Sequence, residues 1–120
     1  MPPLFTPHAV ALAGRGVLAL LFVLAGITKL AGPRPVLAHM AQEHVPGVLL
    51  PAVALFEIGA GAALLIGWST PVAAGALSLF CVATALVFHR DFAQRAERTA
   101  FAKDLALAGA LAFVAAGAMA

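Results

Sequence analysis

Residues 58–88, IGAGAALLIGWSTPVAAGALSLFCVATALVF, contain no charged side chain over 31 consecutive positions. As one helix this segment would be about 46 Å long, which exceeds the roughly 30 Å hydrocarbon thickness of a bilayer. The sequence GWSTP at residues 67–71 supplies a break, because glycine ends helices, threonine caps them and proline suits their first turn. The segment therefore predicts two membrane-spanning helices joined by a tight turn, over residues 49–67 and 71–89.

Two further apolar segments flank this pair. The first predicted helix covers residues 9–31 and ends before Gly32-Pro33. The last covers residues 101–119 and starts near residues 99–101, with Lys103 and Asp104 in its first turn. The polar loops are residues 32–48, in which Pro35 favours a short interfacial helix with Val36, Leu37 and Met40 on one side, and residues 90–100. The predicted fold is all-α, one membrane domain over residues 1–120 with a four-transmembrane-helix bundle, because helices pair every backbone polar group in lipid.

Composition excludes several other classes of protein. Of 120 residues, 63% are hydrophobic and 10% are charged, whereas soluble domains are about 45–50% apolar and about 25% charged. Seven Lys and Arg residues, mostly in two short stretches, do not form a nucleic-acid surface. Cys81 is the only cysteine, which excludes an intrachain disulfide or cysteine cluster, and no zinc-binding spacing is present, so we expect no metal. Residues 1–14 lack Lys and Arg, which favours a retained helix over a signal peptide.

The basic residues predict an orientation. With four crossings, the two polar loops lie on one side and both termini on the other. Only Arg15 lies nearer the terminal side, whereas the other basic residues lie in or beside the loops: Lys29, Arg34, Arg90, Arg95, Arg98 and Lys103. The positive-inside rule therefore places the loops in the cytoplasm and both termini outside. A C-terminal reporter that is active only in the cytoplasm should be silent, and a strong signal would overturn this prediction.

A small set of residues is costly in lipid and is the candidate site: Arg15, Lys29, Glu57, His89 and Lys103. Glu57 lies near mid-membrane, and Arg15, about 9 Å inside the outer end of its helix, is expected to reach it as an ion-pair partner. Lys29, His89, Lys103 and Asp104 come to similar depth at the cytoplasmic end. His8, His39 and His44 are interpreted as loop or interface residues.

Two interpretations of these charges remain open. In the first, they line a polar pocket that opens to the cytoplasm, with Glu57 at its floor, and bind a quinone-like head group or relay protons. In the second, the Arg15–Glu57 pair holds the bundle together, and Lys29, His89 and Lys103 extend to the membrane surface. Small residues such as Gly59, Gly61, Gly75 and Gly109 favour close helix packing, either within one bundle or in a homo-oligomer.

Four segments, taken in order, resemble the DoxX family of small bacterial membrane proteins, which includes DoxD-type relatives. They are GRGVLALLFVLAGITKLAG, HVPGVLLPAVALFEIGAGAALLIGWST, ATALVFHRDF and FAKDLALAGALA. The resemblance implies a four-helix protein of the bacterial inner membrane and matches the family pattern at all five candidate residues. Asp104 departs from it, because the expected residue is Asn. Some relatives are linked to membrane redox work, including a thiosulfate:quinone oxidoreductase subunit and partners in thiol and oxidative-stress defence.

Three functions follow as alternatives. The first is an accessory subunit of a membrane redox system that binds quinone or a sulfur compound and needs a partner protein for electrons, because Cys81 alone cannot run dithiol exchange. The second is a non-enzymatic scaffold whose charges only stabilise the bundle. The third is a small transporter or proton pathway, for which four short helices leave little room unless the chains oligomerise.

Overall fold

The computed structural model describes residues 5–119, which are helical for most of their length and contain no strand. The all-α prediction is therefore confirmed; the first four residues of the 1–14 segment discussed above lie outside the described residues. Within residues 5–119, four helices are long and apolar enough to cross a membrane, and a short helix and a 3-10 turn (η1) lie between the first two. The elements are α1 (Pro7–Ala31), α2 (Arg34–Gln42), η1 (Gly47–Leu49), α3 (Leu50–Ile66), α4 (Thr70–Phe88) and α5 (Arg95–Met119).

The helix ends follow from local chemistry. The side chain of Thr6 accepts a hydrogen bond from the backbone N–H of Ala9 at 3.0 Å and caps α1. Gly67 ends α3 with φ 79°, a left-handed conformation that glycine adopts without steric cost, as the sequence predicts. The cap of α4 is Ser69, one residue earlier than predicted, and Thr70 is instead the first, buried residue of the helix.

The last helix begins earlier than the sequence predicts. It starts at Arg95 rather than at residues 99–101, because the N–H of Arg98 already bonds to the Gln94 carbonyl at 3.1 Å. The Asp91 side chain accepts from the Gln94 side chain at 3.1 Å and fixes the turn before the helix. Lys103 and Asp104 therefore lie about two turns inside α5 rather than in its first turn.

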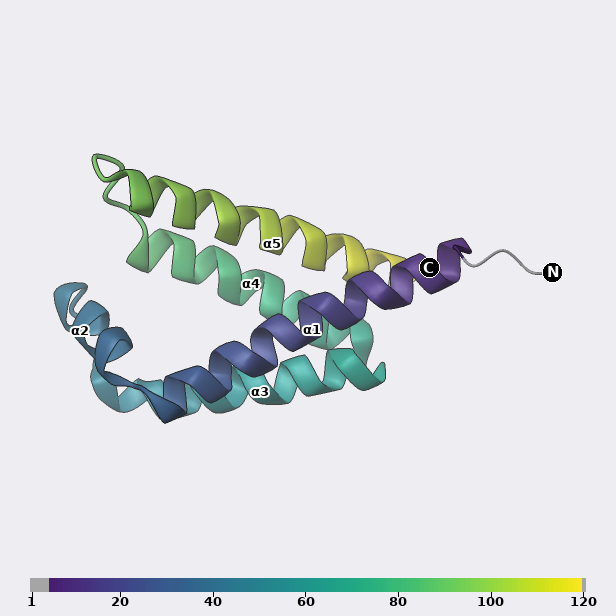
Figure 1. Cartoon of the computed structure of the whole chain (residues 1–120), viewed down its shortest axis with the longest axis horizontal. Helices are drawn as coiled ribbons and strands as arrows, with labels where there is room; N and C mark the ends of the chain where they lie inside the picture. The colour runs from purple at the N-terminus through teal and green to yellow at the C-terminus, as the bar shows by residue number, and fades with distance from the viewer. Residues whose placement is uncertain (1–4, 120) are drawn as a thin grey trace.

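The four long helices form two antiparallel pairs. α1 packs along α3 and α4 packs along α5, whereas α3 and α4 contact each other over a shorter stretch. In Figure 1 the pairs meet near the turn between α3 and α4 and diverge toward the opposite end, where α2 lies. The start of α1 and the end of α5 lie at the first end, which we call the closed end. The connections that contain α2 and residues 89–94 lie at the other, which we call the open end.

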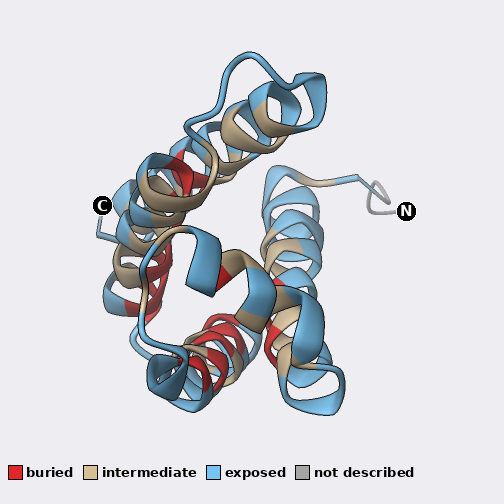
Figure 2. Cartoon of the chain, turned by 90° about the vertical axis from the view of Figure 1, so that its left-hand side faces the viewer, coloured by how far each residue is buried: buried red, intermediate tan, exposed pale blue. Residues whose placement is uncertain are grey.

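The core occupies the inner faces of the bundle. It joins α1, α3, α4 and α5 through buried residues such as Phe22, Leu64, Leu77 and Leu111. Figure 2, which looks into the open end, shows buried positions on the sides of the helices that face one another. Large apolar side chains that cover the outside include Val17 (69% exposed), Leu79 (73%) and Phe113 (82%). Apolar side chains on the outer surface are what contact with lipid requires of a membrane helix bundle.

Two glycines set the contact between α1 and α3. A Cβ at Gly26 would lie 2.6 Å from the Ala54 carbonyl oxygen, and one at Gly61 would lie 3.1 Å from the Ala19 carbonyl oxygen. The two backbones therefore approach as closely as only glycine permits. A Cβ at Gly59, Gly75 or Gly109 would meet no atom within 4 Å, so association of chains through those positions stays a prediction.

Replacing Gly26 with alanine should separate the α1–α3 pair. The added methyl group would meet the Ala54 carbonyl oxygen and the Ile58 side chain, each at 2.6 Å, and the backbone carbonyl cannot turn aside, so we expect a loss of about 1–3 kcal/mol in the free energy of unfolding. Gly14→Ala is the matched control in the same helix, because a Cβ there has open space around it. Unfolding in detergent measures both variants. Equal stability of the two would contradict the close approach.

Candidate functional site

A cavity of about 610 Å³ lies between the two helix pairs at the open end. Its walls are mostly apolar and come from all four long helices, whereas α2 contributes residues at the mouth. Apolar lining residues include Leu21, Phe22, Leu50, Phe80, Phe88 and Leu107. Four of the five residues predicted to form a polar pocket also line it: Lys29, Glu57, His89 and Lys103.

The floor of the cavity holds an ion pair between Lys29 and Glu57. The ammonium group of Lys29, in the last turn of α1, donates a hydrogen bond to the Glu57 carboxylate from the middle of α3. The Glu57 side chain is 2% exposed and the Lys29 side chain is 23% exposed. A buried carboxylate needs such a partner, since an unpaired charge is costly to bury. The lysine is therefore the member of the pair that faces the cavity.

A second polar group lies on the opposite wall, where α4 and α5 meet. The Thr84 hydroxyl donates to the Asp104 carboxylate at 3.1 Å, and the same carboxylate oxygen is 3.6 Å from Nε2 of His89. Nδ1 of His89 in turn lies 3.1 Å from a carboxylate oxygen of Glu97. Asp104, the departure from the family pattern, thus faces Thr84 and His89. Lys103 is exposed at the cavity edge, and within residues 5–119 it forms no ion pair.

The predicted ion pair between Arg15 and Glu57 is wrong. The guanidinium of Arg15 lies beside Gly67 at the closed end, where Nη2 is 3.2 Å from the place a Gly67 Cβ would take. The antiparallel register explains this, because Gly26 faces Ala54 and Gly61 faces Ala19. That register sets Arg15 near the level of Gly67 and leaves Lys29 close enough for its long side chain to reach Glu57. Arg15 lines a separate depression between α1 and α5, with His8 at its edge.

The positions of α2 and of its histidine also differ from the sequence prediction. The short helix forms, but Val36 and Met40 line the cavity, and Met40 is buried, so its apolar side faces the bundle rather than lipid. His39 is half-buried, and its Nε2 lies 3.0 Å from the Phe88 carbonyl oxygen. His39 therefore lines the cavity from a helix, which its interpretation as a loop or interface residue did not include, whereas His44 is exposed. The signal was available, because His39 follows Val36 by three residues and shares its helix face.

Glu97 is a further residue of the site that the sequence did not predict. Once α5 starts at Arg95, Glu97 and Asp104 are seven residues apart and lie on one face, two turns from each other. That face meets His89 at the end of α4. The seven-residue spacing between Glu97 and Asp104 indicates a shared helix face only if residues 95–100 are predicted to be helical.

The sequence is similar to that of known proteins. The sequence model of the DoxX family matches residues 10–90. A curated relative, inner membrane protein YqjF of Escherichia coli (strain K12), is 36% identical over 98 residues, which cover 82% of this chain and 75% of the relative. No solved structure matches. The family resemblance predicted from the four quoted segments is confirmed.

Proposed function

Because the chain belongs to the DoxX family and is a multi-pass protein of the inner membrane, we propose that it binds a quinone-like head group in the cavity, as an accessory subunit of a membrane redox system. The observation that carries the proposal is the Lys29–Glu57 pair at the floor of an otherwise apolar cavity. Binding sites for small molecules combine such apolar walls with a few polar groups that orient the ligand.

Lys29 is the group that would contact the ligand. An ammonium group has three N–H donors, and one of them is used by Glu57, so donors remain for a carbonyl oxygen of a quinone. Glu57 is a positioning residue, because its carboxylate holds the ammonium at the cavity floor. The cavity volume of about 610 Å³ falls within the roughly 300–1,000 Å³ of typical ligand sites. The apolar walls suit the ring and the start of an isoprenoid tail.

Electrons would have to come from a partner protein. Cys81 is the only cysteine, so the chain has no internal dithiol for exchange chemistry. The open end, which carries most of the basic residues, is the end we assign to the cytoplasm, with both termini outside. A redox partner on the cytoplasmic side would then meet the mouth of the cavity.

Quinone binding to the purified protein tests the proposal. A short-chain, fully substituted benzoquinone should bind detergent-solubilised protein saturably, with one molecule per chain. Lys29→Gln and Glu57→Gln should each weaken binding by about tenfold or more, the effect expected when a charge-assisted hydrogen bond worth about 1.5–3 kcal/mol is lost. Calorimetry measures the affinity.

Arg15→Gln is the matched control, because it removes an intramembrane cation that lies at the closed end. Its affinity for the benzoquinone should equal that of the unaltered protein. Absence of binding, or equal weakening by Arg15→Gln, would contradict the proposal. If the cavity variants lose stability but bind as before, the charges act only as structural contacts and do not orient the quinone.

A further inference from the structure

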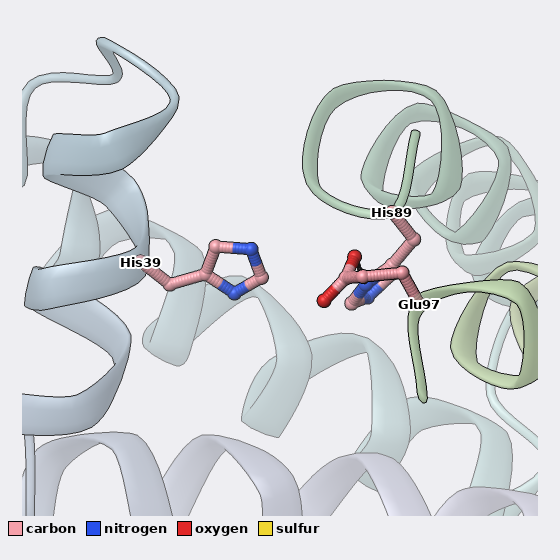
Figure 3. A group of neighbouring side chains, drawn as sticks. All are labelled: His39, His89 and Glu97. Atoms are coloured by element: carbon pink, nitrogen blue, oxygen red, sulfur yellow. Dashed lines mark hydrogen bonds and ion pairs between the residues drawn. The ribbon is translucent and has the colours of Figure 1, made fainter. Parts of the chain in front are cut away.

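Three side chains from distant parts of the sequence converge at the mouth of the cavity. His39 comes from α2, His89 follows the last turn of α4, and Glu97 lies near the start of α5 (Figure 3). One donor atom from each of them lies within 4.8 Å of the other two. All three are half-buried, so the side chains retain freedom to adjust.

The two imidazoles are held in place by other contacts. His39 lies edge-on to the Phe88 ring, with centroids 5.2 Å apart, and its Nε2 bonds to the Phe88 carbonyl at 3.0 Å. The His39 and His89 rings are 5.7 Å apart. This contact fixes α2 against the end of α4. The histidines are therefore positioned by the fold rather than only neighbouring by chance on a surface.

The groups around His89 favour a bound cation. Its Nδ1 faces Glu97 at 3.1 Å and its Nε2 faces Asp104 at 3.6 Å, so a carboxylate flanks each nitrogen. A neutral imidazole has one N–H and can donate to only one of them, which leaves a lone pair facing a carboxylate. A metal ion between Nδ1 and Glu97 resolves this conflict, because Nε2–H can then donate to Asp104. Metal-bound histidines commonly donate their second N–H to a carboxylate in this way.

We propose that His39, His89 and Glu97 bind a Zn²⁺ ion, with Asp104 orienting His89. Two imidazoles and one carboxylate are a common protein ligand set for zinc, with the fourth position left to water or a ligand. Donor atoms in a tetrahedral site are about 3.3 Å apart, so the side chains must close by about 1.5 Å at most. The ion would link α2 to α4 and α5 and so stabilise the mouth of the cavity.

Zinc titration of the purified, tag-free protein tests this inference. Competition with a chromophoric chelator should give one Zn²⁺ per chain, and X-ray absorption should show nitrogen and oxygen ligands with two imidazoles. His39→Asn, His89→Asn and Glu97→Gln should each weaken zinc binding by at least about tenfold. The titration contains no quinone, so its outcome is independent of the proposed function.

His44→Asn is the matched control. His44 is exposed and lies outside the cluster, and its φ of 59° is one that asparagine tolerates. Zinc affinity should be unchanged in this variant. Absence of stoichiometric zinc would overturn the inference and favour an imidazolium between the two carboxylates. A sulfur ligand in the absorption spectrum, or equal loss in His44→Asn, would also overturn it. The absorption spectrum of the unaltered protein decides the matter if a cluster variant fails to fold.

Discussion

Replacing Lys29 with methionine is expected to lower the free energy of unfolding by about 3 kcal/mol or more. The substitution keeps the length of the side chain but removes the only ion-pair partner that Glu57 has within residues 5–119. Glu57 is 2% exposed, so water cannot take over the role of the ammonium group. Reversible unfolding in mixed micelles measures the loss.

Two further variants separate the ion pair from the loss of a charge in general. Lys29→Met combined with Glu57→Leu should recover most of the stability, because apolar replacement of a complete buried pair is often nearly neutral. Arg15→Met should have a much smaller effect than Lys29→Met, since Arg15 lies beside Gly67 and away from Glu57. The ion pair would lose its assigned role if the double variant were less stable than either single variant.

Filling the cavity is expected to weaken quinone binding strongly while leaving the fold intact. Ala25 lines the cavity from α1 and is half-buried, so tryptophan at this position places its ring in the space assigned to the ligand. We expect affinity to fall by about 100-fold, which corresponds to about 2.8 kcal/mol of lost binding free energy. Calorimetry with the short-chain benzoquinone measures the change.

Ala13→Trp is the control for this substitution. Ala13 lies on the same helix, is exposed, and lines neither the cavity nor the depression at the closed end. Its variant should bind the benzoquinone with unchanged affinity. Undiminished binding by Ala25→Trp in a folded protein would mean that the ligand lies elsewhere.

The membrane architecture was predictable because it depends on length and composition. The uncharged segment 58–88 is too long to cross the membrane once as a single helix. The glycine in its middle leaves few places for the turn that divides it into two helices. Gly67 takes the positive φ that ends α3, as expected. The predicted start of α5 lies several residues after the observed start, and the cause is equally plain. Residues 95–100 are polar and resemble a loop, although they form the first turns of a helix that extends beyond the apolar segment.

The pairing of charges was not predictable in the same way. α1 and α3 carry apolar residues on nearly all sides, so periodicity does not show which faces meet. Their register depends on where Gly26 and Gly61 allow backbone contact, and that register selects Lys29 rather than Arg15 as the partner of Glu57. The position of His39 depends on how α2 folds back over the cavity, which no local pattern specifies.

Photolabelling with a short-chain azidoquinone tests the central claim most directly, because it reports where the head group lies. The unaltered protein in lipid nanodiscs would be illuminated and its labelled peptides identified by mass spectrometry. The cavity hypothesis predicts adducts on α1, α3 and α4 near Ala25, Val53 and Phe80, suppressed by excess unlabelled quinone. Adducts confined to lipid-facing positions such as Val17 or Leu79, or insensitive to competing quinone, would contradict it.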